Sequence, residues 1–541
     1  LALIFPAAAQ AQFTEAPAPA AYALRNVTVV RPDGSSEAGQ TLIVRAGRIE
    51  ALARDAAVPA DARVLDGDTL YVYPGFVDAA GSIPFEFPRD TTDRSRVRSW
   101  DPPRTLQGFM PSRRVIDYVN ATGDDGEDLR KDGIVAVAVH PTLNEPLMSG
   151  RGVLVLLRPD AESPQDLVLD PVLAPLMSLR GSRGTYPSTQ MGVIAWYRQT
   201  FLDAQHRMAV AEARSANGAG PAPSFDADMD IVQELLRSNG RVYFAADDAN
   251  AIRRVLGLAG EFGFRPVIVG GAEAWKVADE LGAAEVPVLV SLDFPEPERW
   301  DPDEPEEDAA SEPLAPAAAR ERKELEDIYA NAGRLADAGV TFALVSAGSE
   351  DLREGVAKAI EYGLREADAL RALTTTPAAL LGVPQLAHVE RGSAATFTVA
   401  DRPVFSEDAR ILYTFVEGVL QQGATTERSG AGDASGDEPV NVAGTWTVEV
   451  LSPQTQTFTL NLTQDGNTVT GTIESPEGTA PVSGTISGAA LALDATIQIG
   501  GQSFDIEING DVNGDEASGV LGTSMGDIDW KARRTGPGAR P

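Results

Sequence analysis

The feature that most constrains the fold is a central region in which short apolar runs alternate with segments of helical periodicity. Segments such as 249–262 and 367–381 repeat apolar residues three and four positions apart, the spacing of one helix face. The alternation favours a parallel α/β barrel or a doubly wound sheet. The runs that we interpret as buried strands are 72–78, 133–140, 241–246, 266–270, 286–292 and 340–346.

Two sets of short alternating strands, at 22–72 and 389–422, flank that region. Each set is too small to enclose a core, so the simplest architecture pairs them into one composite β-sandwich. Residues 73–388 are then a domain inserted between its two halves. An acidic, Pro- and Ala-rich tract at about 295–316 interrupts the insert, and it cannot bury enough apolar surface to fold alone.

The C-terminal part of the chain reads as a separate all-β domain. A Gly-, Ala- and Ser-rich acidic linker at 423–440 precedes it, and such a composition is typical of a flexible connection. Residues 441–533 then hold roughly eight short Thr-rich alternating strands, separated by turns such as Asp465-Gly466. This pattern predicts a barrel or a sandwich.

The first eleven residues resemble the end of a secretory signal. Residues 1–11 are mainly apolar and finish in the small-x-small pattern Ala9-Gln10-Ala11, which predicts cleavage near Ala11 and export to the periplasm or the extracellular space. No later stretch approaches the roughly 20 apolar residues of a membrane span. We therefore expect an exported protein without a membrane span.

Composition excludes several classes of function. The chain carries 79 acidic against 45 basic side chains, a formal net charge of −34. Binding to a phosphate backbone draws its affinity from neutralised phosphates, so nucleic acid is not an expected partner. The absence of cysteine excludes disulfides, thiolate metal sites and cysteine nucleophiles.

One segment carries a family resemblance. Residues 71–83, Tyr-Val-Tyr-Pro-Gly-Phe-Val-Asp-Ala-Ala-Gly-Ser-Ile, resemble the first barrel strand of the amidohydrolase superfamily, in particular its imidazolonepropionase-like and dihydroorotase-like members. The similarity extends over about residues 22–422. It implies a TIM-like (β/α)8 barrel inserted in a composite β-sandwich, and a relationship to hydrolases of carbon–nitrogen bonds other than peptide bonds. Further similar segments are 129–141, 149–153, 186–192, 198–204, 271–278, 376–382 and 389–399.

The resemblance also implies a zinc site whose ligands this chain lacks. Ala80 and Ser82 stand at the two positions of the family's His-x-His pair, and the next two histidine positions fall at Ala245 and Gly270. The aspartate that serves the family as general base would fall at Ala347. The whole chain has three histidines, where the family normally uses four, so we expect no cofactor.

Five polar residues are candidates for binding a ligand at the barrel mouth: His140, Asp247, Asp248, Glu273 and Ser346. Each follows or ends a predicted strand, and the ligand sites of such barrels lie at the carboxyl ends of the strands. Structural roles are open for the same residues. His140 would then be hydrogen-bonded at a strand end, and one of the two aspartates would cap the following helix.

Three functions are compatible with this sequence. The first is an amidohydrolase-like protein without its metal site, acting as a binding protein or as the partner subunit of an active paralogue. Its ligand would be a small amide or peptide-like molecule, and it could form a homo-oligomer. The second is an active carbon–nitrogen hydrolase with an altered site. The third is an exported binding or adhesion protein that works through its C-terminal β domain.

Overall fold

The computed structural model divides into two compact units, residues 1–425 and 426–541. The signal-like residues 1–11 lie outside the residues that it describes, as do nearly all of the acidic tract and the linker. No helix among the described residues is long and apolar enough to cross a bilayer. The described residues are 19–66, 70–88, 91–142, 145–217, 224–295, 316–347, 352–406, 409–423, 440–450, 456–466, 468–475, 478–487, 490–499, 502–514, 516–523 and 526–537.

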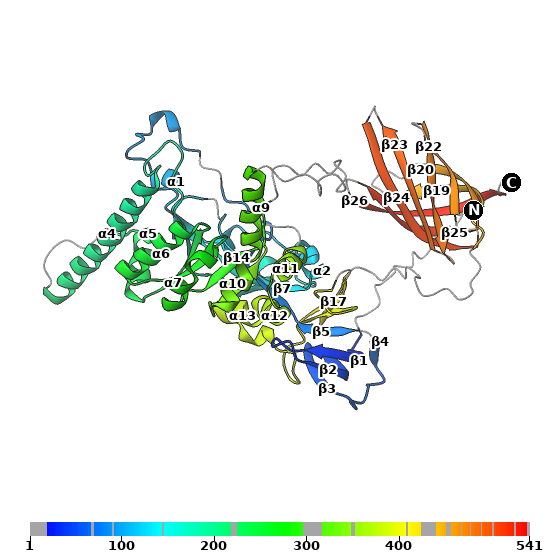
Figure 1. Ribbon diagram of the computed structural model, residues 1–541, viewed down its shortest axis with the longest axis horizontal. Helices are drawn as coiled ribbons and strands as arrows, with labels where there is room; N and C mark the ends of the chain where they lie inside the picture. The colour runs from blue at the N-terminus through cyan, green and yellow to red at the C-terminus, as the bar shows by residue number, and fades with distance from the viewer. Residues whose placement is uncertain are drawn as a thin grey trace, which may run out of the picture. The chain divides into compact units, whose positions relative to one another are not determined.

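Strands from both ends of the first unit form one eight-stranded sheet (Figure 1), in the order β18-β17-β16-β5-β1-β2-β3 with β4 beside β1. β5 and β16 pair antiparallel, with Val72 opposite Val399, and so join the two ends of the unit. Leu24, Phe397 and Phe415 meet in the core that this sheet covers. The strands are β1 (Ala21–Val30), β2 (Ser36–Arg45), β3 (Arg48–Ala53), β4 (Ala62–Asp66), β5 (Tyr71–Pro74), β16 (Phe397–Ala400), β17 (Ile411–Val416) and β18 (Val419–Gln422).

The region between them is a mixed α/β fold whose strands form two sheets, ordered β10-β9-β7-β6 and β15-β14-β13-β12-β11-β8. β11 to β15 run parallel, as do β6 and β7, but β9 is antiparallel to β7 and β8 is antiparallel to β11. The strands are β6 (Phe76–Gly81), β7 (Ile134–Val139), β8 (Met148–Arg151), β9 (Val153–Leu156), β10 (Val168–Asp170), β11 (Pro175–Ser178), β12 (Arg241–Ala246), β13 (Arg265–Gly270), β14 (Val288–Ser291) and β15 (Phe342–Val345).

This pairing differs from the single parallel barrel that the resemblance implies. β8 and β9 are consecutive, separated by Gly152, and each pairs with a different sheet, so this antiparallel run links the two sheets. The far edges also meet, because the amide of Ala347 donates to the carbonyl of Ala80 at 3.1 Å. Side chains from strands of both sheets form one buried cluster: Val77, Ala136, Leu154, Leu176, Tyr243, Val269, Leu289 and Ala343.

Helices cover the outer faces of these strands. α6 shows why the sequence folds this way: Asp248 caps its first turn, Ile252, Val255 and Leu258 are buried, and Gly263 ends it at φ +78°. The main helices are α4 (Gln190–Asn217), α5 (Ala227–Arg237), α6 (Ala249–Phe262), α7 (Ala278–Ala283), α9 (Pro316–Tyr329), α10 (Asn331–Asp337), α11 (Leu352–Glu361), α12 (Glu366–Leu373) and α13 (Thr375–Leu381). Shorter pieces are α1 (Arg104–Gln107), α2 (Glu127–Lys131), α3 (Pro164–Leu167) and the 3-10 turns η1 (Arg94–Arg96), η2 (Val115–Asp117), η3 (Asp124–Gly126), η4 (Ala274–Val277) and η5 (Pro384–Ala387).

The second unit is a closed barrel of eight antiparallel strands, in which each strand pairs with the next and β26 returns to β19. Trp446, Leu460, Val482 and Trp530 are among the described residues that form its core. The strands are β19 (Gly444–Val450), β20 (Gln456–Asp465), β21 (Thr468–Ser475), β22 (Gly478–Ser487), β23 (Ala490–Ile499), β24 (Gln502–Asn513), β25 (Glu516–Thr523) and β26 (Gly526–Pro537).

Candidate functional site

A pocket of about 460 Å³ opens where the parallel strands of the larger sheet end. We call it the mouth pocket. The carboxyl ends of parallel strands are the common location of ligand sites in α/β proteins. The lining of the mouth pocket includes Ser178, Arg180, Ala245, Asp247, Asp248, Gly270, Ser291, Asp293 and Ala347.

Three of the five positions where the family resemblance places metal ligands or the general base line this pocket: Ala245, Gly270 and Ala347. Ala80 is buried next to it, with its amide bonded to Asp78 Oδ1, and Ser82 is exposed beyond the end of β6. Ala347 also adopts φ +51°, a left-handed conformation that is unfavourable for a residue with a Cβ. Ala245, Gly270 and Ala347 thus contribute only small side chains to the lining of the pocket.

The carboxylate of Asp247 takes up the space next to Gly270. A Cβ placed on Gly270 would lie 2.1 Å from Asp247 Oδ1, and Gly270 has φ +98°. The positive φ strains any side chain at this position, and the carboxylate of Asp247 would have to rotate away to admit one. A histidine at 270 and the observed position of Asp247 are mutually exclusive.

Asp247 is also electrostatically distinct. The protein around its carboxylate raises the pKa of Asp247, and the negative charge of Asp248 raises it further, against smaller opposing effects of a backbone hydrogen bond from Ala272 and the charge of Arg180. Its side chain still reaches solvent through the pocket. A carboxyl with a raised pKa can hold a proton and so both donate and accept a hydrogen bond.

The other acidic candidates cap α6. Asp248 lines the mouth pocket, but one of its oxygens accepts from the amide of Ala251 at 2.9 Å. Glu273 lies outside the lining: its Oε2 accepts from the amide of Ala249 at 3.0 Å, and its Oε1 lies 2.7 Å from Lys276 Nζ. The hydrogen bond with Lys276 lowers the pKa of Glu273. Of the two aspartates that sequence suggested as caps, Asp248 has that role.

Ser346 does not line the pocket. Its hydroxyl donates to Asp78 Oδ2 at 2.6 Å, and both residues are buried, with exposed fractions of 6% and 1%. Asp78 also accepts from the amide of Ala80, so this carboxyl connects β6 to the end of β15. Burial raises the pKa of Asp78. The hydrogen-bonded pair of Asp78 and Ser346 therefore joins two strands and does not face the pocket.

His140 is buried behind the pocket. Its Nε2 lies 3.0 Å from the carbonyl of Ala79, and its ring packs 4.4 Å from that of Tyr243, centroid to centroid. Burial lowers the pKa of His140 to about 4, so the imidazole is neutral at pH 7. The position of His140 fits the strand-end role rather than contact with a ligand in the mouth pocket.

The donor set around the mouth does not fit zinc. Structural and catalytic zinc sites use three or four nitrogen, sulfur or carboxylate ligands. Among the residues that the structure describes, no group of three or more histidine, aspartate and glutamate side chains is placed to hold a metal ion. We therefore derive no chemical step through a metal.

Five polar residues of the pocket were missed in the sequence: Ser178, Arg180, Gln190, Ser291 and Asp293. Asp293 directly follows the predicted strand 286–292, so the rule that selected Asp247 could also have selected it. Arg180 follows β11 (Pro175–Ser178), which was not among the strands predicted from the sequence. Both residues follow the carboxyl end of a strand, so correct strand ends, and no special motif, would have identified them.

Comparison with protein-family models finds no match, and neither does comparison with curated protein sequences. The described residues define a mixed α/β protein with a composite sheet and a pocket at its parallel strand ends. An amidohydrolase from Thermotoga maritima has the same fold: its TM-score is 0.58 at 23% identity, over 74% of this chain and 99% of that chain.

Other solved structures also match at lower TM-scores. They include a Xaa-Pro dipeptidase with bound methionine, at TM-score 0.43 and 12% identity over 74% of this chain and 100% of that one. An ochratoxinase from A. niger matches at TM-score 0.37 and 13% identity, over 74% of this chain and 96% of that one.

Proposed function

We propose that this chain is a divergent, noncatalytic relative of the amidohydrolases that binds a small amide or peptide-like ligand in the mouth pocket. The observation that carries the proposal is the pair of Gly270 and Asp247. At a position where the family resemblance implies a metal-binding histidine, a carboxylate fills the space instead, 2.1 Å from where a Cβ would stand. The site is remodelled around a different polar group, while a volume of about 460 Å³ is kept.

A distorted (β/α)8 barrel is part of the same proposal. The buried cluster shared by both sheets and the hydrogen bond from Ala347 to Ala80 support a ring of eight strands. In this ring the continuous run of β8 and β9 counts as the third strand, after β6 and β7, and it runs antiparallel to its neighbours. The mouth pocket would then occupy the usual ligand site of such barrels.

The chemistry of Asp247 suggests the ligand. A protonated carboxyl and an amide are complementary, because each offers one donor and one acceptor side by side. The raised pKa of Asp247 keeps the protonated form populated at a higher pH than for an aspartate surrounded by water. Binding of a neutral amide should therefore strengthen as the pH falls toward the raised pKa of Asp247.

The test is calorimetric titration of the full chain with N-acetylglycinamide and N-acetylprolinamide, together with an assay for their hydrolysis. We expect saturable binding without product, and about tenfold weaker binding in Asp247→Ala, because this change removes both the donor and the acceptor of the carboxyl. Asp279→Ala, an exposed change on α7, is the matched control.

Two results would contradict the proposal that the chain is noncatalytic. One is hydrolysis of either probe that disappears in Asp247→Asn, which would favour the active hydrolase, with Asp247 as a general acid or base. The other is stoichiometric zinc in the purified protein that is lost together with activity in His140→Ala. If ligand binding disappears when residues 426–541 are removed, the C-terminal unit is the main binding site instead.

A further inference from the structure

A second pocket, of about 750 Å³, lies beside the mouth pocket and carries four arginines: Arg94, Arg113, Arg180 and Arg183. We call it the arginine pocket. Arg180 lines both pockets, so the two share a wall. We propose that the arginine pocket binds a small organic anion that has an apolar body, as a site separate from the amide site proposed above.

The charge of this lining is opposite to that of the chain. The protein has 79 acidic and 45 basic side chains, yet this pocket gathers four arginines and a single acidic residue, Glu145. Like charges held together in one cavity repel each other, and an anion placed among them removes that cost. A cationic cavity on a protein of net charge −34 therefore selects anions locally.

The arginines have different positions in this arrangement. Arg113 is neutralised: its Nη2 lies 2.6 Å from Glu145 Oε2, and its guanidinium stacks 3.7 Å from the centre of the Phe87 ring. Arg94 and Arg183 have no ion-pair partner within the described part of the chain. These two are the residues that we expect to contact the anion.

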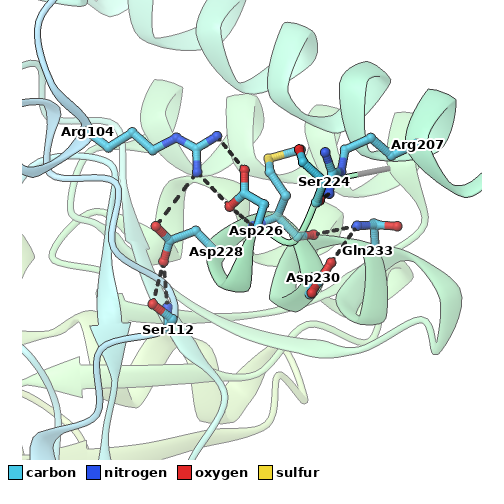
Figure 2. Close-up of polar contacts among 9 residues, drawn as sticks. Arg104, Ser112, Arg207, Ser224, Asp226, Asp228, Asp230 and Gln233 are labelled. Atoms are coloured by element: carbon cyan, nitrogen blue, oxygen red, sulfur yellow. Dashed lines mark hydrogen bonds and ion pairs between the residues drawn. The ribbon is translucent and has the colours of Figure 1, made fainter. Parts of the chain in front are cut away.

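Hydrogen bonds and ion pairs hold the walls of the pocket in place. Figure 2 shows Arg104, next to the pocket residue Thr105, bound through both terminal nitrogens to Asp226 at the start of α5, at 2.7 and 2.9 Å. The same view shows Asp228 accepting from the hydroxyl and the amide of Ser112, next to Arg113.

The opposite wall is tied to the first one. The hydroxyl of Ser182 donates to the carbonyl of Gln107 at 2.8 Å, and the amide of Tyr186 donates to Ser99 at 2.7 Å. Walls that are fixed before binding reduce the entropy lost when a ligand enters. The pocket is thus preformed.

The lining also defines the chemistry of the ligand. Guanidinium groups bind carboxylate and phosphate oxygens through paired hydrogen bonds. Phe87, Leu106, Met110 and Pro146 supply apolar surface in the same cavity. The fitting ligand is an aryl- or alkyl-substituted carboxylate or phosphate rather than an inorganic ion.

The experiment titrates the full chain calorimetrically with 3-phenylpropionate, phenyl phosphate and the neutral 3-phenylpropanamide. We expect both anions to bind, and the neutral amide to bind at least tenfold more weakly than either of them. The anion that binds more tightly identifies the preferred head group, carboxylate or phosphate. Arg94→Gln and Arg183→Gln should each weaken anion binding about tenfold or more. Arg96→Gln is the matched control. It removes the same charge two residues from Arg94, but the side chain of Arg96 is 88% exposed and does not line the pocket.

The proposal is overturned if neither anion binds, if the amide binds as tightly as the anions, or if Arg96→Gln has the same effect as the pocket variants. Its outcome is separable from that of the amide site. Asp247→Ala should leave binding of phenyl phosphate within about twofold of the wild type, and Arg183→Gln should leave N-acetylprolinamide binding unchanged.

Discussion

The carboxylate of Asp247 lies where a Cβ on Gly270 would stand, so substitutions at these two positions should affect each other's cost in stability. Gly270→Ala forces a Cβ to within 2.1 Å of Asp247 Oδ1 and strains a residue at φ +98°. We expect a loss of about 1–2 kcal/mol in the free energy of unfolding from the left-handed strain, and a smaller additional loss from displacing the Asp247 carboxylate. Urea unfolding of the full chain, followed by tryptophan fluorescence, measures it.

The control is Gly257→Ala in α6, where an added Cβ meets no atom within 4 Å. This substitution should stabilise the protein by about 0.5–1 kcal/mol, because alanine is the better helix former. Adding Asp247→Ala to Gly270→Ala should recover part of the loss. Strictly additive effects would show that the carboxylate does not occupy that space.

His140 gives the folded state a pH dependence with a defined sign. Its pKa falls from 6.5 to about 4 on folding, so the unfolded chain binds more protons between these values. The contribution of His140 to stability is complete above pH 6.5 and is lost as the pH falls toward 4. A shift of this size corresponds to about 3 kcal/mol.

The difference in unfolding free energy between the wild type and His140→Gln, measured from pH 7.5 to pH 4, isolates this effect from other groups. We expect the difference to change by about 3 kcal/mol over that range. His206→Gln, an exposed change on α4, is the control and should follow the wild-type profile. A constant difference for His140→Gln would mean that the imidazole is not buried in the folded protein.

Sequence reasoning named the positions at which the family resemblance places metal ligands, but it did not predict which side chains lie around them. Reading Ala245, Gly270 and Ala347 as vacated positions needs only a motif and the order of the strands. The position of the Asp247 carboxylate in front of Gly270 depends on side-chain packing between β12 and β13, which no local pattern encodes. Ser346 and Glu273 follow strands as expected, but Asp78 and the amide of Ala249 bind them.

At the scale of single elements, α5 anchors the wall of the arginine pocket through Asp226. This residue caps the helix, with Oδ1 accepting from the amide of Met229 at 3.2 Å, and also pairs with Arg104. The hydrogen bond from Arg104 lowers the pKa of Asp226. One carboxylate thus serves both the helix and the segment packed on it.

Two substitutions separate these roles. Asp226→Ala should cost about 1–2 kcal/mol of unfolding free energy, because it removes the cap and the ion pair. Asp226→Asn keeps a capping oxygen and should cost less than about 1 kcal/mol, since the pair is partly exposed. Both should speed proteolysis within residues 94–113. Equal stability losses in the two variants would show that the cap contributes little.

Element prediction succeeded where the pattern is local. The expected helix 249–262 coincides with α6, because its cap, its apolar face and its terminal glycine are all sequence signals. The expected helix 367–381 is instead two helices that break at Thr374, where the hydroxyl bonds back to Leu370. Pro377 supports the break, since it cannot donate to the carbonyl of the preceding turn. The antiparallel direction of β8 and β9 is a tertiary feature, and periodicity does not report strand direction.

At the scale of the whole molecule, the two units should be separable but the first should not be divisible. A chain that ends at Thr425 keeps all eight strands of the composite sheet, so we expect one cooperative unfolding transition and a circular dichroism spectrum with helix and strand. A chain that ends at residue 388 loses β16 to β18 and exposes the edge of β5. We expect it to aggregate. A soluble, cooperatively folded 1–388 fragment would contradict this view.

The pairing of β5 with β16 has a consequence for biosynthesis. Residue 74 ends β5 and residue 397 begins β16, so the ribosome must add more than three hundred residues before the two can meet. At about 5–20 residues per second, the nascent β5 waits on the order of twenty seconds to a minute with an open edge. Chaperones that shield exposed strands should therefore associate with translating ribosomes over this interval. Slowing translation within residues 74–397 should lower the yield of native protein more than slowing it afterwards.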